Sequence, residues 1–422
     1  MVYSPLGKEY IGLLGQSSSF ISAFNVAQVC LTWFVFTYTH SATAVGTVAI
    51  VESLAVLLVS LPVGTLVDRL NKGLLLTVSG AMGALVFAIL TVISNLLIFN
   101  LYIIMALAAV WGASREISRS TAFAALPDLV GQDSLSGANG LFRALNSSLG
   151  SISNAAAGGL IVALGVAAGF AFSSGAYLLS ALLAAFIIFP FLRKHHVAKS
   201  GRADKRQSMM ADLKEGLHWL TGTKGFFLLT VSATFFNFFI DMTITFYVIY
   251  IATGVKASSL IYGLVLSALA GGDVIGSLIP GRLNLLKYTG KISVLAYGGV
   301  SGILLLILGI FPSAVNAIVF TFIIGISLGI SVNVWLTSAH NLVPREMRGR
   351  YFALDGVLSS ISPAAIAVGA FVINSVGILQ DFIVSGALLL VATVAFSSMR
   401  SLWRLDGSLP PQAVHSETIG ND

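Results

Sequence analysis

Eight charged side chains lie inside long apolar stretches of this sequence, where a charge is costly and tends either to pair or to function. They are Glu52, Arg115, Glu116, Arg119, Arg143, Asp241, Asp273 and Asp355. A carboxyl in a dry environment can hold and release a proton, and an arginine can bind a carboxylate or an anionic ligand. These residue types therefore indicate proton transfer and charge recognition.

Asp241 is the strongest candidate for a proton carrier. It lies deep in an apolar stretch, FFNFFIDMTITFYVIY, whose aromatic residues favour the neutral form of a buried carboxyl. Asn237 lies one helical turn earlier and is expected to hydrogen-bond to Asp241. The alternative interpretation is a carboxyl that is kept neutral by a hydrogen bond to a neighbouring helix and has no chemical role.

Four further charges have a predicted partner or role. Glu116 and Arg119 are three residues apart and share a helix face, so we expect an ion pair, either structural or functional. Arg115 points to another face, where it can meet an anionic ligand or an acidic side chain. Glu52 is predicted either to take part in proton coupling or ligand contact, or to lie in a wet outer vestibule. Arg119 is also expected to join Arg143, Asp273 and Asp355 in an intramembrane network of packing or gating residues.

The elements that position these residues are membrane-spanning helices. The chain is 56% hydrophobic and 9% charged, whereas a globular protein carries about 25% charged residues. A bilayer core requires about 20 apolar residues per helix, and this length predicts an all-α membrane protein with twelve spans. The predicted spans are residues 11–37, 44–67, 74–95, 98–125, 136–164, 168–192, 224–252, 258–280, 291–311, 314–341, 351–376 and 379–399.

The distribution of basic residues predicts the orientation of the chain. With the N-terminus inside, the cytoplasmic segments hold nearly all Lys and Arg residues, and the outer loops hold only Lys256. Cytoplasmic loops of membrane proteins are enriched in Lys and Arg in this way. We therefore expect a multi-pass protein of the cytoplasmic or inner cell membrane, with both termini in the cytoplasm.

One long polar segment, residues 193–223, divides the chain. It predicts an N-terminal six-helix bundle (1–192), a cytoplasmic linker (193–223), a C-terminal six-helix bundle (224–402) and a cytoplasmic tail (403–422). Within the linker, one helical face carries Met209, Met210, Leu213, Leu217 and Leu220. This pattern predicts an amphipathic helix that lies on the membrane surface.

The two halves of the chain resemble each other. A shift of 213 residues places Arg69-Leu70-Asn71 on Arg282-Leu283-Asn284, and it also places Gly112 on Gly325. Repeated matches at one offset predict an internal duplication. Because each half has six spans, both halves enter the membrane in the same direction, as two parallel repeats that can rock around a central cleft.

Three motifs resemble those of a known family. GTLVDRLNKG (64–73), between spans 2 and 3, and VPREMRGR (343–350), between spans 10 and 11, resemble loop signatures of the major facilitator superfamily. ALPDLVGQDSLSGANGL (125–141) is similar to the enterobactin-exporter and macrolide-efflux branch of that superfamily. The resemblance implies a twelve-span transporter fold. It also implies an arginine in span 4 tied to proton coupling, for which Arg115 is the nearest match.

The turn GTLVDRLNKG is predicted to belong to a cytoplasmic gate. Gly64 would let a neighbouring helix approach, and Asp68 is placed to meet the positive N-terminus of span 11. Arg69 is predicted to bind Asp128 at the end of span 4. The basic residues beside the N-terminus of span 11 are Arg348 and Arg350.

These features predict a secondary active transporter that works by alternating access. The expected activity is proton-coupled efflux of a hydrophobic or amphipathic small molecule that is drug- or siderophore-like. The pair Gly290-Lys291 lacks the rest of a phosphate-binding loop, so the proton gradient is the expected energy source, without cofactor or metal. The alternatives are a uniporter, a proton- or sodium-coupled symporter that imports a small solute and, more remotely, a membrane-embedded enzyme. The expected partners are the substrate, protons and the lipid bilayer, with no nucleic acid, for a monomeric chain.

Overall fold

The structure of the protein is a computed structural model that describes residues 7–130, 134–196, 209–283, 285–344, 347–359 and 361–408. Within these ranges, the side chains of residues 61, 68, 136, 193–196, 209–213, 281, 282, 353 and 359 lie outside the description. Within the described ranges, twelve helical segments are long and apolar enough to cross a membrane. The predicted all-α fold with twelve spans is thereby confirmed.

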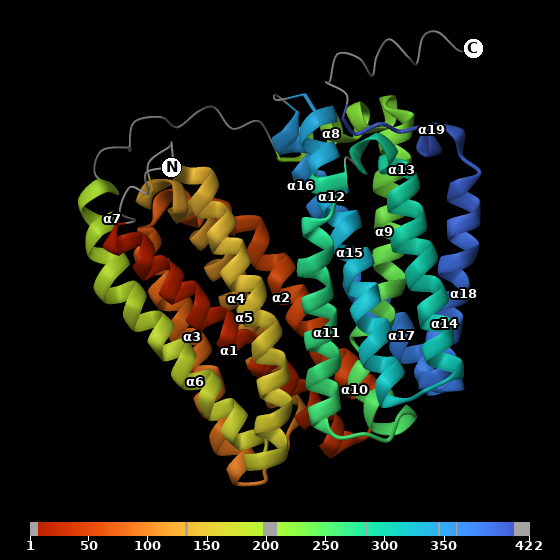
Figure 1. Ribbon diagram of the computed structural model, residues 1–422. Coiled ribbons are helices and arrows are strands. Elements are labelled where there is room, and N and C mark those ends of the chain that lie inside the picture. Colours follow the sequence, from red (N-terminus) through yellow and green to blue (C-terminus); the bar gives the residue numbers. More distant parts are fainter. Residues whose placement is uncertain are drawn as a thin grey trace. The chain divides into compact units, whose positions relative to one another are not determined.

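Each of the first six spans follows a glycine or polar N-cap residue, namely Gly7, Ser41, Asn71, Asn100, Ser134 and Gly165. The spans are α1 (Lys8–Thr39), α2 (Ala42–Arg69), α3 (Lys72–Asn95), α4 (Leu101–Leu129), α5 (Leu135–Leu164) and α6 (Val166–Leu183), which continues through the π-helix η2 (Ala184–Ile188) into α7 (Phe189–His196) (Figure 1). The Asn71 side chain accepts a hydrogen bond from the backbone N–H of Gly73 at 2.8 Å, and Asn100 accepts one from Tyr102 at 3.0 Å. These caps satisfy backbone donors at the starts of α3 and α4.

The second half of the chain contains more interruptions. Its elements are α8 (Met209–Gly222), α9 (Lys224–Ile244), α10 (Tyr247–Ile249), η3 (Tyr250–Gly254), α11 (Ser259–Leu278), α12 (Pro280–Leu283), η4 (Leu285–Tyr288), α13 (Thr289–Ile292), η5 (Ser293–Val300), α14 (Ser301–Ile310), α15 (Ala314–Leu342), α16 (Arg348–Ser359), α17 (Ser362–Val376), α18 (Ile378–Ser397) and α19 (Arg400–Trp403). The helix expected in the linker is present as α8. The rest of the linker and the end of the tail lie outside the described residues.

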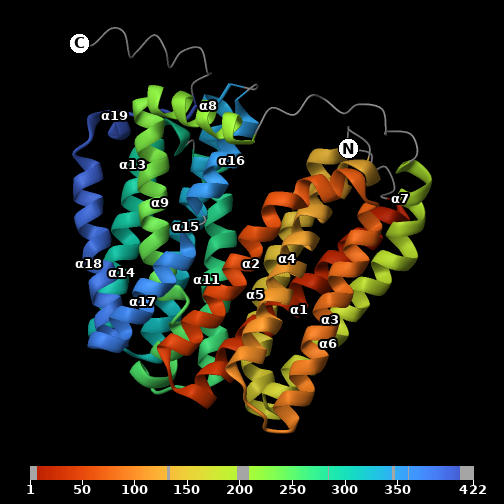
Figure 2. The same ribbon diagram turned by 180° about the vertical axis from the view of Figure 1, so that it is seen from behind.

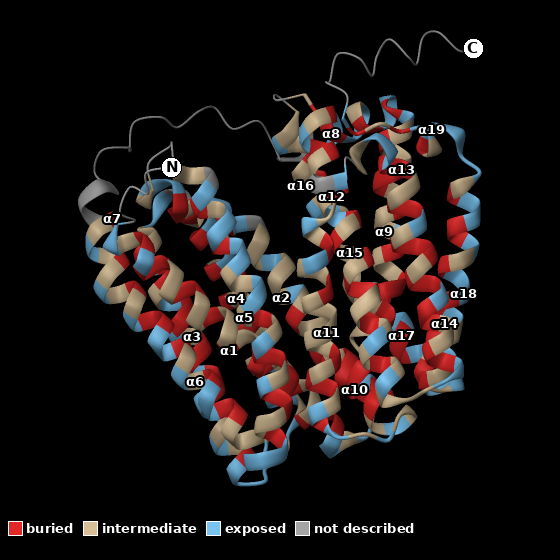
Figure 3. Ribbon diagram, viewed as in Figure 1, coloured by how far each residue is buried: buried red, intermediate tan, exposed pale blue. Residues whose placement is uncertain are grey.

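By their internal contacts the residues form two compact units. One comprises Met1–Arg202 with Ile251–Ser267, and the other comprises Ala203–Tyr250 with Ala268–Asp422 (Figures 1 and 2). In the first unit α3 packs on α4 and α6, and α1 packs on α5 and α6. In the second, α14 packs on α15 and α18, and α9 packs on α17 and α18. The same spans pair in each half, as a duplicated six-helix bundle requires. Figure 3 shows buried residues on the helix faces that pack inside each unit.

Glycines at equivalent positions permit equivalent helix crossings. A Cβ atom on Gly112 of α4 would lie 2.6 Å from the carbonyl oxygen of Glu52 on α2. A Cβ atom on Gly325 of α15 would lie 2.2 Å from the carbonyl oxygen of Leu269 on α11. No side chain fits at such distances, so a glycine at both positions allows the backbones of these spans to approach closely. This packing explains why the two glycines match at the repeat offset.

Two spans that the sequence predicts to be continuous are broken in the structure. In span 7, α9 ends at Ile244, and the Thr245 hydroxyl donates a hydrogen bond to the Asp241 carbonyl oxygen at 3.0 Å. Hydroxyl groups that bond back to the preceding turn bend helices in this way. In span 11, α16 ends at Ser359 and α17 begins at Ser362 with Pro363 in its first turn, a position that a proline tolerates. Span 9 contains the π-helix η5, and such segments are frequent at functional sites.

Candidate functional site

The first unit contains an ion pair between α2 and α4. The Arg115 guanidinium lies 3.3 Å from the Glu52 carboxylate, and it also lies over the Phe24 ring at 4.4 Å from the ring centre. Glu52 is only 7% exposed. Gly112 lies one turn before Arg115 and brings the backbone of Glu52 against α4. Arg115 thus meets an acidic side chain, one of its two predicted partners. The burial of Glu52 argues against a position in a wet outer vestibule.

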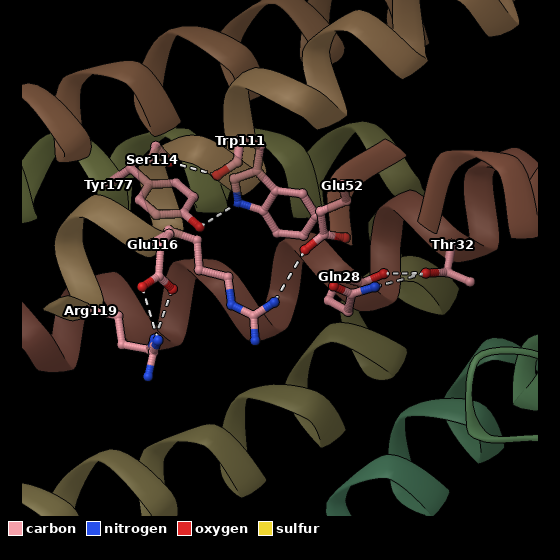
Figure 4. A network of polar contacts seen from close by, with 9 residues as sticks. Gln28, Thr32, Glu52, Trp111, Ser114, Glu116, Arg119 and Tyr177 are labelled. Atoms are coloured by element: carbon pink, nitrogen blue, oxygen red, sulfur yellow. Dashed lines mark hydrogen bonds and ion pairs between the residues drawn. The ribbon is translucent and has the colours of Figure 1, made fainter. Parts of the chain in front are cut away.

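The predicted ion pair of Glu116 and Arg119 is present, and it is fully bonded (Figure 4). Arg119 donates to both carboxylate oxygens of Glu116 at 2.9 and 3.0 Å, and the Ser120 hydroxyl donates a third hydrogen bond at 2.8 Å. Glu116 is 2% exposed, whereas Arg119 is exposed. Because three donors already satisfy this carboxylate, the structural interpretation of the pair is favoured.

Neutral hydrogen bonds hold the helices around these charges. The indole N–H of Trp111 donates to the Tyr177 hydroxyl at 2.7 Å and joins α4 to α6 (Figure 4). Both side chains are fully buried. On α1, the Gln28 amide donates to the Thr32 hydroxyl at 3.4 Å. The first bond links two helices of the unit that holds the Glu52–Arg115 pair, whereas the second lies within α1.

The predicted gate residues of the first unit lie at the end of α2 and, for Asp128, at the end of α4. Lys72 forms an ion pair with Asp128, a contact that the sequence did not predict, and also donates to the Ala124 carbonyl oxygen at 2.8 Å. Arg69 and Gly64 are exposed, and a Cβ atom on Gly64 would meet nothing within 4 Å. The side chain of Asp68 lies outside the described part of the structure.

Arg143 is the last predicted charge of the first unit. It is exposed on α5, and its guanidinium lies over the Phe123 ring at 5.6 Å from the ring centre. This contact agrees with a packing role for Arg143.

In the second unit, Asp241 and Asn237 have different partners from those predicted. The side-chain amide oxygen of Asn237 accepts a hydrogen bond from the Tyr297 hydroxyl on η5. The half-buried Asp241 instead has a side-chain hydrogen bond with Ser362 at the start of α17. The prediction that Asn237 bonds to Asp241 is therefore wrong, because η5 presents a phenol to the amide. Tyr297 also lies near enough to Asp241 to interact with it electrostatically.

A cavity of about 120 Å³ opens beside these residues, between α9, η5, α15 and α16. Its lining includes the half-buried Asp355, together with Asn237 and Tyr297. From the sequence, Asp355 was expected only in a charge network and Asn237 only beside Asp241, and neither Tyr297 nor the lining serines were identified as site residues. Small polar residues inside apolar stretches, in KISVLAYGGV and GISVNVWL, were the available signal.

Three further predicted residues occupy the packed parts of the second unit. The backbone of Asp273 lies where α11 crosses α15, because a Cβ atom on Gly329 would lie 2.1 Å from its carbonyl oxygen. Arg348 at the start of α16 donates hydrogen bonds to the carbonyl oxygens of His340 and Val343. Arg350 forms an ion pair of 2.7 Å with Glu215 of α8.

One further buried carboxyl, that of Asp381, was not among the residues predicted from the sequence. Asp381, in the first turn of α18, is fully buried, and neither of its side-chain oxygens has a hydrogen-bond partner among the described residues. It stands in an apolar stretch, GILQDFIVSGALLL, so the criterion that identified Asp241 would also have found it. In the described ranges, no cluster of three or more His, Cys, Asp or Glu residues is arranged to hold a metal ion.

Comparisons with known proteins place these features in context. The family model described as Major Facilitator Superfamily matches residues 13–365. No curated protein matches the chain. Among solved structures, the peptide transporter POT in complex with sulfate aligns with a TM-score of 0.70 at 13% identity, over 96% of this chain and 97% of that one.

Two further transporters align at the same level of identity. A bacterial homologue of the human lysosomal transporter Spinster aligns with a TM-score of 0.67 at 13% identity, over 97% of this chain and 100% of its own. A mutant of the nucleoside transporter NupG aligns with a TM-score of 0.66 at 13% identity, over 93% of this chain and 100% of its own. At such low identity these likenesses demonstrate the fold alone.

Proposed function

The chain belongs to the Major Facilitator Superfamily and is therefore a multi-pass secondary transporter, and we propose that it exports a hydrophobic or amphipathic small molecule in exchange for protons. Alternating access in such folds is a rocking of one six-helix repeat against the other around a site at mid-membrane. Export against proton entry requires a group that is protonated in one step of the cycle and deprotonated in another.

The observation that carries the proposal is the environment of Asp241. Its side chain is half-buried and bonds to the Ser362 hydroxyl. In the described part of the chain, no Lys or Arg lies within ion-pair distance of it. A membrane carboxylate without a cation is best neutralised by a proton, which suits a proton carrier.

The Glu52–Arg115 pair supplies a second element of the proposal. Protonation of Glu52 would remove the charge that binds Arg115, and the arginine would then be able to bind an acidic group elsewhere. Arg115 is 41% exposed, so its guanidinium has room to change partners. Proton binding on the first unit would thus change the charge that the first unit presents to a cargo.

The cargo is proposed from the sequence and not from the fold relatives. Those relatives are named for nucleosides, for peptides and for a lysosomal transporter, and 13% identity does not choose among them. The stretch 125–141 supports the enterobactin-exporter and macrolide-efflux branch, hence a drug- or siderophore-like compound. We further propose a monomer in the cytoplasmic or inner membrane with both termini inside, because Lys and Arg are concentrated in the segments assigned to that side.

The experiment that tests this function is flux in proteoliposomes. The purified protein is reconstituted with a pH gradient, and the movement of erythromycin, ethidium and a catecholate siderophore is measured with and without the gradient. We expect at least one compound to move against the direction of proton flow. Transport that does not depend on the pH gradient would indicate a uniporter, and transport in the same direction as the protons would indicate a symporter. Transport that depends only on a sodium gradient would identify sodium, and not the proton, as the coupling ion.

The turn at residues 64–73 is proposed to latch the cytoplasmic side. Cations at a helix N-terminus oppose the helix dipole, and Arg348 and Arg350 occupy the start of α16. We propose that Asp68 supplies a carboxylate at the N-terminus of α16, where it would offset the positive charge of the helix end and of the two arginines. The latch would stabilise the outward-facing state.

Replacing Asp68 by asparagine is expected to shift the protein toward the inward-open state. The measurement is the rate at which a maleimide added from the cytoplasmic side labels Val332→Cys. Val332 is a 46% exposed residue of α15 that lines the cavity of the second unit. The only native cysteine, Cys30, is buried. Labelling should be faster with Asp68→Asn than with the control Glu9→Gln. Equal rates in the two variants would exclude the latch.

A further inference from the structure

The cavity of the second unit has the composition of a cation-binding pocket. Among its lining residues one is acidic, Asp355, and none is basic. Among the residues that the structure describes, no Lys or Arg lies within ion-pair distance of Asp355. The carboxyl is thus left without a counter-charge at a cavity wall, where a bound cation would offset the cost of its burial.

Two hydroxyl groups of the lining lack the partners that buried groups normally have. Ser293 on η5 is 6% exposed and Ser331 on α15 is 3% exposed. Neither hydroxyl has a hydrogen-bond partner in the described structure. Because a buried polar atom without a partner costs about 1–3 kcal/mol, a ligand or water molecule in the cavity is expected to bond to them.

Three aromatic side chains complete the wall, namely Phe236, Tyr297 and Trp335. The Tyr297 hydroxyl donates its proton to Asn237, so its oxygen remains available as an acceptor. Aromatic faces attract organic cations, and the attraction rises to about 2 kcal/mol when the cation is desolvated. A metal ion would gain less from such a wall, because hard cations select oxygen ligands alone.

The size and depth of the cavity fit a small head group. A volume of about 120 Å³ is below the roughly 300–1,000 Å³ of sites that hold a whole drug-sized ligand. Asp355 lies seven residues after Arg348, the first residue of α16, which is about 10 Å along the helix at about 1.5 Å per residue. A head group can therefore enter while a larger apolar body stays outside.

From this arrangement we propose that the cavity binds a protonated amine, the head group of an amphipathic organic ammonium cargo. Asp355 pairs with the charge, the hydroxyl groups of Ser293 and Ser331 accept ammonium hydrogen bonds, and the rings of Trp335 and Tyr297 cover the adjoining methylenes. The π-helix η5 allows this, because it carries both Ser293 and Tyr297 toward the cavity. This inference rests on the proposed export function, and it specifies the class of cargo.

Equilibrium binding to the purified full-length protein in detergent tests the proposal without any gradient. The probes are 4-phenylbutylamine and its neutral analogue 4-phenylbutanol, measured by titration calorimetry. We expect the amine to bind at least about tenfold more tightly than the alcohol, a difference of about 1.4 kcal/mol. Equal affinities for the two probes would overturn the proposal.

Variants of the lining identify the site. Asp355→Asn should weaken amine binding by about tenfold or more, whereas Asp273→Asn, an acid of the same unit outside the cavity, should leave it unchanged. Trp335→Phe keeps an aromatic ring and should retain amine binding, whereas Trp335→Leu removes the ring and should lose it. This comparison distinguishes a requirement for the aromatic ring from a general effect of the substitution on folding. Unchanged amine binding in both Asp355→Asn and Trp335→Leu would contradict the proposed ammonium site. A protein that binds sodium through Asp355 but does not bind the amine would also contradict it.

The experiments can distinguish a failure of the proposed ammonium pocket from a failure of the proposed proton-coupled export. If the amine binds through Asp355 but no probe moves with a pH gradient, the pocket stands and the proposed proton exchange fails. If an anionic or neutral compound is exported against protons and the amine does not bind, export stands and the ammonium pocket is wrong.

Discussion

Replacing Asp241 by asparagine is expected to abolish gradient-driven transport while the protein still folds and binds its cargo. The amide has nearly the same size as the carboxyl and retains an oxygen that can accept the hydrogen bond with Ser362. It cannot take up a proton, so the step that couples proton entry to export is lost. The measurement is cargo accumulation in proteoliposomes with an imposed pH gradient, which should fall to the level of empty liposomes.

Two controls separate coupling from folding in this experiment. Exchange of labelled for unlabelled cargo needs no net proton movement, and Asp241→Asn should retain it. Asp241→Glu keeps a titratable carboxyl one methylene further along and should recover part of the accumulation. Normal accumulation in Asp241→Asn would remove this residue from the mechanism and leave the pair in the first unit as the coupling element.

The second large effect is expected from Arg115→Met. This change leaves Glu52, which is 7% exposed, without its cation. Removing one partner of a buried ion pair costs about 3–5 kcal/mol, and the 41% exposure of Arg115 places the expected loss at the lower end. The thermal unfolding temperature of the purified protein in detergent should fall accordingly.

The reciprocal variant should lose less stability. Glu52→Gln leaves an arginine that is 41% exposed and still lies over the Phe24 ring. The double variant Glu52→Gln with Arg115→Met should recover most of the loss, since no uncompensated charge remains. Arg143→Met, which removes an exposed arginine over Phe123, serves as a control and should cost no more than about 1 kcal/mol.

The pH dependence of these variants has a definite sign. In the wild type Arg115 favours the ionised form of Glu52, and this attraction is present only while Glu52 is ionised. In Arg115→Met the ionised Glu52 is a penalty, and protonation removes it. Between about pH 8 and about pH 5, the difference in unfolding temperature between the two proteins should therefore narrow. A difference that widens on acidification would show that Glu52 is not the source of the loss.

The sequence predicted which charged residues lie inside the membrane-spanning helices more accurately than it predicted which side chains they contact. Glu116 and Arg119 form the expected pair because both lie on one helix, where the spacing alone determines whether they meet. Asn237 and Asp241 are also one turn apart, yet they bond to different helices. Tyr297, about 60 residues away, competes for the amide, and nothing in the local spacing of α9 reveals it.

By itself the sequence determined that this protein crosses the membrane twelve times as two parallel repeats. Hydrophobic length belongs to a run of consecutive residues, and a duplication appears as matches at one offset, so neither requires knowledge of distant contacts. The tertiary structure alone decided that Glu52 pairs with Arg115, that Lys72 binds Asp128, and that Asp355 faces a cavity with two unpartnered hydroxyls. These contacts depend on how each helix is rotated and interrupted. The break after Ile244 and the π-helix at Ser293–Val300 set those rotations through packing between spans.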